Sequence, residues 1–285
     1  AILVVDAIVS GAQAQAVEHR FGSYRLIELD QRLRWSWEHL NQHELSIVRA
    51  SIRSDIAAPG PRHQGALIAA VMLASVRRVS DVAGLRLREA RAGEDFVDCQ
   101  GRWHRAILRP QKAWRAAPSL QEFLQPAVDV VVLDLPTKLR AALVGLMAAH
   151  PNSLTLGEAL RLTDATVLDA LSRWLDPLRL EHPTSRLTHG RLARALPVEI
   201  SAQAAGNEVV VHSLTGSAQD VPPIASYYTA APAAAMKQIY QRAVCDLFEE
   251  SPSLVAVAAA GGHTGPALLS HGARRAIAET LRDRM

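Results

Sequence analysis

The sequence predicts a mainly α-helical protein with one small antiparallel β-sheet, an α+β fold class. Aromatic residues make up only 5% of the 285 residues, whereas apolar residues make up 49%. The core must therefore consist mostly of Ala, Leu, Val and Ile, a composition that favours helices over sheets. Strand-like runs punctuated by Gly and Pro are confined to residues 85–135.

The first helical signals precede the predicted sheet. The stretch "HRFGSYRLIELDQRLRWSWEHL" has apolar residues at helical spacing. Asn41 then precedes Glu44 by three positions, as in a capping box, which marks the start of a helix. After a loop at 58–62, the run "HQGALIAAVMLAS" is apolar on nearly every face, which is typical of a buried helix.

The sheet and the later helices follow in order. The runs "DFVDCQGRWHRAILRP" and "VDVVVLDLP" have the composition of strands. Apolar residues at helical spacing predict helices within 137–182 and over 188–203, 208–215 and 233–250. A Gly-rich break at 261–265, "GGHTG", then precedes a last amphipathic helix, "RRAIAETLRDRM".

Composition also restricts the setting in which the protein acts. The 31 basic residues include only three Lys. Because planar Arg donors suit phosphate, this bias is compatible with a nucleic-acid partner, although a GC-rich genome would produce it as well. Cys99 and Cys245 lie far apart and form no CxxC pair, a cytosolic pattern that predicts no disulfide framework and no zinc site. The longest apolar runs are too short to span a bilayer, so no membrane partner is expected.

The sequence lacks the motifs of several enzyme classes. It contains no HExxH, Walker loop, GxSxG or GxGxxG, and no carboxylate cluster that suggests a two-metal nuclease. What remains is a set of basic residues at particular places, together with two adjacent tyrosines, Tyr227 and Tyr228, where a proline-bearing loop meets a helical run.

The stretch "ASVRRVSDVAGLRL" at 74–87 follows the predicted buried helix. It resembles the first arginine box of the tyrosine recombinase, or phage integrase, family, in which an apolar helix ends in a Gly-Leu-Arg-Ile-Ser-Glu-Leu-like sequence. In this register Arg78 takes the place of the catalytic arginine, and Ser80 and Asp81 match the Ser-Glu pair. Val76 and Arg77 stand where the family has Gly-Leu.

The second arginine box of the family reads His-x-x-Arg, and two registers compete for it here. Starting the box at Thr188 leaves too many residues before the next Gly-terminated helix. Starting it at Arg191 places Arg194 22 residues before Gly216, much as the family spaces it. The resemblance then implies that Arg194 is the catalytic arginine and that Arg191 stands in the histidine's position. Ser217 takes the last place of the family's Leu-Gly-His or Leu-Gly-Trp.

The family also has a lysine on a hairpin of the sheet and a tyrosine nucleophile before an amphipathic helix. Lys112 follows a predicted strand and matches the lysine. Positions eight and eleven after Tyr228 are Met236 and Ile239, both apolar as the family's pattern requires. The same count from Tyr227 gives a poorer match. We therefore expect Tyr228 to be the nucleophile and Tyr227 to be its packing neighbour.

The resemblance implies a site-specific DNA recombinase or integrase that cuts and rejoins DNA through a 3′-phosphotyrosine intermediate, with no cofactor, metal or ATP. The partners that it implies are double-stranded DNA and further copies of the chain, four of which act on paired sites. A type IB topoisomerase-like enzyme shares this chemistry and is one alternative. The positions of Arg191 and Ser217, which are not histidines, motivate another: a member that binds DNA without cutting it.

The basic residues of the first box extend into a larger positive region. Residues 75–115 contain ten Arg and Lys residues against five Asp and Glu residues. We expect this region to face the DNA backbone, with Arg77, Arg109 and Arg115 as DNA contacts.

The predicted domain organisation is a catalytic domain over 39–285 that follows an N-terminal segment or interdomain linker over 1–38. That segment is too short for the helical DNA-clamping domain that family members carry upstream, so this domain is expected to be missing. Residues 266–285 form either a helix exchanged between subunits or an ordinary packed terminal helix, two alternatives that the sequence does not separate.

Overall fold

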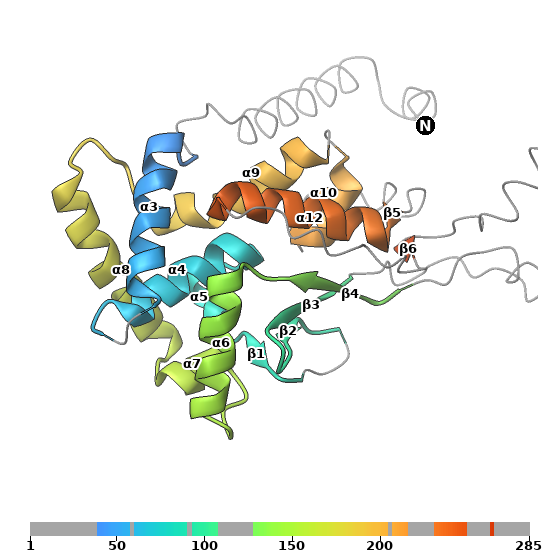
Figure 1. The fold of residues 1–285 in the computed structure, drawn as a ribbon, viewed down its shortest axis with the longest axis horizontal. Coiled ribbons are helices and arrows are strands. Elements are labelled where there is room, and N and C mark those ends of the chain that lie inside the picture. The colour runs from blue at the N-terminus through green and yellow to red at the C-terminus, as the bar shows by residue number, and fades with distance from the viewer. Residues whose placement is uncertain are drawn as a thin grey trace, which may run out of the picture.

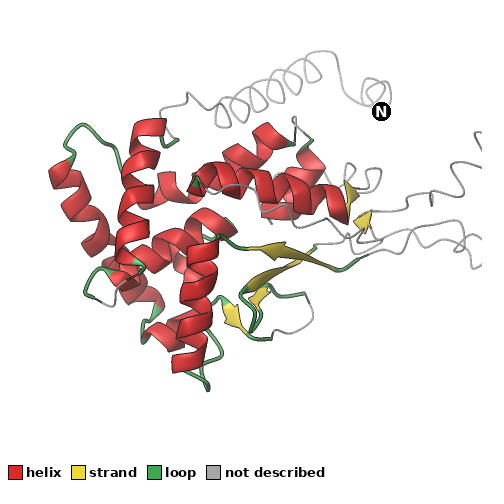
Figure 2. Cartoon of the chain, viewed as in Figure 1, coloured by secondary structure: helices red, strands yellow, loops and turns green. Residues whose placement is uncertain are grey.

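A computed structural model describes residues 39–57, 60–89, 93–107, 128–204, 207–215, 231–249 and 263–264 of the chain. Helices form most of this part of the protein, and a small sheet lies at one side of them (Figures 1 and 2). The predicted α+β class is thereby confirmed. None of the helices within these ranges is both long and apolar enough to cross a membrane.

The first described helices have the ends that the sequence predicts. Helix α3, Gln42–Asp55, begins at Asn41, whose side chain accepts a hydrogen bond from the Glu44 N–H while the Glu44 carboxylate accepts one from the Asn41 N–H. Helix α4, His63–Ser75, is buried on all faces from Gly65 onward. A Cβ at Gly65 would lie 2.3 Å from Cβ of Trp174 on helix α8, Asp164–Glu181, so glycine permits the close approach of these two helices.

The sheet contains four strands in the order β1-β2-β3-β4, which run over Arg86–Leu87, Phe96–Val97, Arg102–Ala106 and Val130–Asp134. Strands β2, β3 and β4 pair antiparallel, with Trp103 opposite Leu133. Strand β1 pairs parallel to β2, so the prediction of a purely antiparallel sheet was wrong for this pair. After β1, Arg88 adopts a left-handed backbone with φ 73°, and its guanidinium donates hydrogen bonds to backbone carbonyls of residues 147, 150 and 153. The Glu89 N–H donates to the Leu87 carbonyl at 3.0 Å, so the chain turns tightly at Arg88 where β1 ends.

The remaining elements continue the helical part of the fold. Short helix α5 follows α4, and after the sheet come the helices and the two short strands that complete the described chain. Their bounds are α5 Val79–Val82, α6 Thr137–Ala149, α7 Leu156–Leu160, α9 His189–Gln203, α10 Glu208–Thr215, β5 Ala231–Pro232, α12 Ala233–Phe248 and β6 His263–Thr264.

Helix α4 lies at the centre of the core. It packs against α3, α6, α8 and α9, while α12 packs against α9 and β4 (Figure 1). The sequence predicted only a Gly-rich break at 261–265, but His263 and Thr264 within it pair antiparallel with β5. This pairing brings them beside the start of α12.

Candidate functional site

The predicted site residues fall into two groups. Arg77, Arg78, Arg191 and Arg194 lie in the part of the chain that the structure describes. The other predicted positions lie outside the described residues: Lys112, Arg109, Arg115, Ser217, Tyr227, Tyr228 and residues 266–285.

Arg78 stands at the junction between α4 and α5. Val76 ends α4 in the left-handed conformation, with φ 57° and ψ 10°, and Arg78 is the extended N-cap residue of α5. The Arg78 side chain is exposed and does not cap this helix, although its carbonyl accepts a hydrogen bond from the Asp81 N–H at 2.9 Å. The junction therefore presents the guanidinium of Arg78 at the surface. The left-handed residue also stands where the resembled family has glycine, which adopts this conformation without the roughly 1–2 kcal/mol that it costs other residues.

Arg77 points back into the protein and joins the end of α4 to the sheet. Its guanidinium lies 3.6 Å from the carboxylate of Asp95, which also pairs with Arg105 on β3. Burial lowers the pKa of Arg77, Asp95 partly offsets this effect, and the neighbouring Arg105 lowers the pKa further. Nε of Arg105 donates to the Ser213 carbonyl on α10 at 3.3 Å. Two arginines that share one carboxylate thus connect α4, the sheet and α10.

A hollow of about 650 Å³ lies beside this cluster. Among the described residues, the guanidiniums and carboxylates that line it are equal in number: Arg77, Arg86 and Arg105 against Glu94, Asp95 and Glu158. Because the charges of these residues balance, they do not by themselves favour an anion. The contribution of Asp95 and Arg105 was not predicted, because their contacts depend on how the end of α4, the sheet and α10 meet.

Arg191 lies in the first turn of α9, with its guanidinium held by α3. It donates to both carboxylate oxygens of Glu44, at 2.7 and 2.8 Å, to the Arg186 carbonyl at 2.6 Å and to the His39 carbonyl. The two paired side chains are only 11% and 2% exposed. Burial raises the pKa of Glu44, but hydrogen bonds from Arg191 and from the backbone of Asn41 and Arg186 lower it more, so its pKa lies below the ordinary value. In this structure Arg191 therefore joins α9 to α3.

Arg194 lies three residues further along α9 and has an exposed side chain. Its neighbours Leu192, Ala195 and Leu196 are buried, and they seat α9 in the core. The helix packs on both α4 and α12. A rigid helix held by a buried ion pair thus carries the second predicted arginine at the surface.

Helix α12 begins five residues after Tyr228 and buries the apolar face that the sequence predicts. Met236 and Tyr240 are completely buried, and Ile239 is half-buried. The Tyr240 hydroxyl donates to the Ala74 carbonyl near the end of α4 at 2.7 Å, and burial raises the pKa of this phenol well above its usual range. Tyr240 is therefore a structural residue and cannot meet DNA as a nucleophile.

Helix α12 also contacts the sheet. Nζ of Lys237 lies 3.0 Å from the carboxylate of Asp134 at the end of β4, and the ring of Tyr240 lies 5.7 Å from that of Trp103 on β3. Because α4, α9 and α12 pack on one another, three segments converge: the one before Arg78, the helix that carries Arg194 and the helix after Tyr228.

Comparisons of the chain with models of protein families, with curated proteins and with solved structures found no match.

Proposed function

We propose that the protein is a site-specific DNA recombinase or integrase that cuts and rejoins DNA through Tyr228. The observation that supports this proposal is the convergence of α4, α9 and α12, together with the exposed side chains of Arg78 and Arg194. Separate boxes of the tyrosine recombinase family match parts of this sequence that lie far from one another. These parts belong to elements that contact one another in the fold. The proposed partner is double-stranded DNA, and the acting assembly is a tetramer on paired sites in the bacterial cytoplasm or nucleoid.

The proposed chemistry assigns the two exposed arginines to the scissile phosphate. A phosphodiester carries one negative charge, and attack on phosphorus spreads more charge over the non-bridging oxygens. Guanidiniums of Arg78 and Arg194 would each donate paired hydrogen bonds to these oxygens. A free tyrosine has a pKa of about 10, so the nucleophile attacks well only where nearby cations stabilise the phenolate.

In the proposed step the Tyr228 hydroxyl loses its proton to solvent, its oxygen forms a bond to phosphorus, and the bond from phosphorus to the 5′ oxygen breaks. Lys112 acts as the general acid and protonates the departing 5′ oxygen. The 3′-phosphotyrosine ester keeps the energy of the broken bond, and attack by a 5′-hydroxyl of another strand reverses the step. The balance of bonds requires neither a nucleotide nor a metal ion.

A nicked suicide substrate tests this proposal, because loss of the short 5′ fragment traps the covalent intermediate. The parent protein should form a protein–DNA adduct that survives denaturation. Tyr228→Phe should abolish the adduct and leave DNA binding intact, whereas the matched variant Tyr227→Phe should still form it. Strand exchange between two duplexes separates a recombinase from a topoisomerase-like enzyme, which would only relax supercoils.

One observation favours a second candidate, a DNA-binding member of the family that does not cut. Arg191 matches the histidine of the second box, but its guanidinium donates to Glu44 and to two backbone carbonyls. If that position must touch the phosphate, the site lacks one donor. A parent protein that binds duplex DNA but forms no adduct on the suicide substrate would establish this candidate.

A further inference from the structure

Residues 76–78 join α4 to α5 and present Arg78 at the surface. The helices on either side are fixed by packing, because α4 is buried and α5 contacts α8. Within the described part of the chain, one backbone hydrogen bond supports residues 76–78, from the Asp81 N–H to the Arg78 carbonyl. The path of the chain between the two helices therefore depends on side chains.

The side chain of Arg77 supplies this support. Its guanidinium donates to the Asp81 carbonyl on α5 at 3.1 Å and lies 3.6 Å from the carboxylate of Asp95, which precedes β2. Arg77 thus connects the junction both to α5 and to the sheet. The next residue, Arg78, has an exposed side chain, so the two neighbouring arginines differ in their surroundings although they carry the same charge.

Asp95 is a rigid partner for Arg77. Its carboxylate accepts hydrogen bonds from the Ala106 N–H at 2.9 Å and from Nη1 of Arg105, both on β3, and only 8% of its side chain is exposed. The Arg105 guanidinium donates in turn to the Ser213 carbonyl on α10 and lies 5.7 Å from the centre of the Trp103 ring. The carboxylate that faces Arg77 is therefore fixed to the sheet.

The sheet also reaches α4 by a second route, which stops short of the junction. Trp103 packs on Tyr240 of α12, with ring centroids 5.7 Å apart, and the Tyr240 hydroxyl donates to the Ala74 carbonyl in the last turn of α4. This route holds the helix itself, which ends at Ser75. Among the described residues, the contact between Arg77 and Asp95 extends the support from the sheet to the residue next to Arg78.

We propose that Asp95 is a positioning residue for Arg78: it holds Arg77 against the sheet, so that the next guanidinium is the one presented to the scissile phosphate. This inference rests on the proposed function. A displacement of about 1 Å at reacting groups slows catalysis by about 100-fold. A small shift of residues 76–78 is therefore sufficient to slow the attack, while the rest of the DNA-binding surface stays in place.

Two variants open this contact from its two sides. Asp95→Asn removes the charge that holds Arg77, and the Asn side chain can still accept from the Ala106 N–H. Arg77→Gln removes the guanidinium and leaves Asp95 paired with Arg105. If Asp95→Asn fails to fold, because two arginines of the cluster lose their carboxylate, Arg77→Gln provides the same test with the buried charges still paired.

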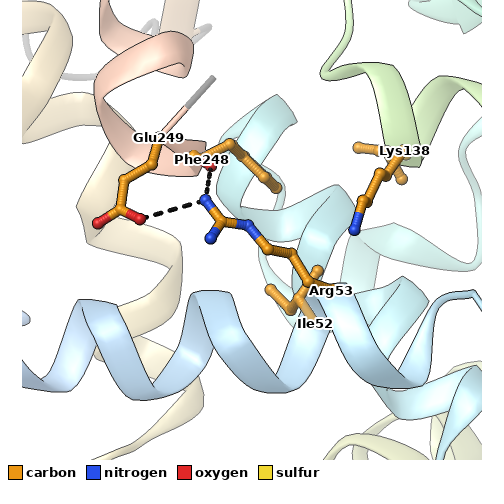
Figure 3. Close-up of a pocket in the computed structure, with 6 residues that line it drawn as sticks. Ile52, Arg53, Lys138, Phe248 and Glu249 are labelled. Carbon is orange, nitrogen blue, oxygen red and sulfur yellow. Dashed lines mark hydrogen bonds and ion pairs between the residues drawn. The ribbon is translucent and has the colours of Figure 1, made fainter. Parts of the chain in front are cut away.

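Glu249 provides the matched control, because its carboxylate is also shared by two arginines. It lies 2.5 Å from Arg49 and 3.2 Å from Arg53 at the C-terminal end of α12, and Figure 3 shows the second of these contacts. Both arginines belong to α3. Glu249→Gln therefore removes an equal charge from a comparable arrangement at a different place in the fold.

The first measurement is the single-turnover rate of adduct formation on the nicked suicide substrate. Asp95→Asn and Arg77→Gln should each slow this rate by about 10- to 100-fold. The double variant should be no slower than the slower single variant, because both changes open one contact. Glu249→Gln should match the parent. Rates like that of the parent for both Asp95→Asn and Arg77→Gln would overturn the proposal.

A methylphosphonate at the scissile position separates positioning from folding. Its neutral methyl group replaces one charged oxygen, so less negative charge develops for Arg78 to stabilise. The ratio of the parent rate to the Asp95→Asn rate should therefore be smaller on this substrate than on ordinary DNA. An equal ratio on the two substrates would overturn the proposal, because it would mean that Asp95 only maintains the amount of folded protein.

Amide hydrogen exchange provides a readout that does not require DNA. If the parent forms no adduct, the proposed function fails, and exchange at Asp81 still tests the contact, because the Asp81 N–H donates to the Arg78 carbonyl. Asp95→Asn and Arg77→Gln should speed exchange at Asp81 relative to the amides of α3, whereas Glu249→Gln should not. Unchanged exchange at Asp81 in the first two variants would contradict the proposal, because Asp95 would then not hold the segment that carries Arg78.

Discussion

Replacing Arg191 by Met removes the guanidinium that joins α9 to α3 while keeping an unbranched apolar stem. In the parent, Glu44 accepts two hydrogen bonds from Arg191 and is only 2% exposed. The resemblance predicts that Arg191 acts on DNA, whereas its contacts in the structure predict a structural role. The variant Arg191→Met separates these two roles.

The cost follows from the burial of the partner. Removing one partner of a buried ion pair costs about 3–5 kcal/mol, because the other charge stays buried without compensation. Glu44 keeps hydrogen bonds from the backbone of Asn41 and Arg186, so we expect the lower end, about 3 kcal/mol. The exposed Arg242 on α12 is the matched control, and Arg242→Met should change the free energy of unfolding by less than about 0.5 kcal/mol.

Equilibrium unfolding in urea measures both free energies. The double variant Glu44→Gln/Arg191→Met should be more stable than Arg191→Met, because it removes the buried charge while Gln keeps the capping-box bond. Since the pKa of Glu44 lies below its ordinary value of 4.5, the stability from the pair is fully present above that pH and is lost as the pH falls through the folded-state pKa. The difference between parent and Arg191→Met should therefore narrow in acid. If Arg191→Met unfolds like the parent yet forms no adduct, the structural account of Arg191 is refuted.

Two further predictions concern the hairpin side of the site. Lys112→Ala should slow cleavage of ordinary DNA. A substrate with a 5′-bridging sulfur has a leaving group that needs no proton, so the variant should cleave it nearly as fast as the parent does. If the variant cleaves this substrate slowly as well, Lys112 has another role. Burial raises the pKa of Asp98, but hydrogen bonds from the backbone of Arg102 and from the side chains of His104 and Arg102 lower it to about 2. Asp98→Asn should therefore cost about 1–2 kcal/mol at pH 7, and thermal melting should show the difference shrinking only as the pH falls from about 4 towards 2. A difference that stays constant down to pH 2 would contradict this account.

The parts of the fold that depend on local sequence could be predicted. The Asn41–Glu44 capping box involves neighbouring residues, and the continuous apolar run of α4 has few alternatives to burial. The parallel pairing of β1 with β2 could not be predicted, because each strand has only two residues and carries too little periodicity to set a direction. The short helix α7 was not predicted separately from its neighbours for the same reason.

Site residues that belong to a sequence motif could be predicted. Site residues that depend on contacts between different elements could not. The resemblance to the family's two arginine boxes led to Arg78 and Arg194, and the structure places both side chains at the surface. The ion pair between Arg191 and Glu44 joins residues 147 positions apart, and no local pattern marks Glu44 as anything beyond a capping residue. The shared use of Asp95 by Arg77 and Arg105 likewise depends on the meeting of α4 with the sheet.

The central claim is that a tyrosine of this chain attacks DNA and that this tyrosine is Tyr228. The most direct test traps the adduct on a nicked suicide substrate, digests the protein and identifies the peptide that carries the nucleotide by mass spectrometry. The account predicts a single modified peptide, with the phosphate ester on Tyr228. An adduct on any other residue, or the absence of an adduct from a protein that binds the same DNA, would contradict it.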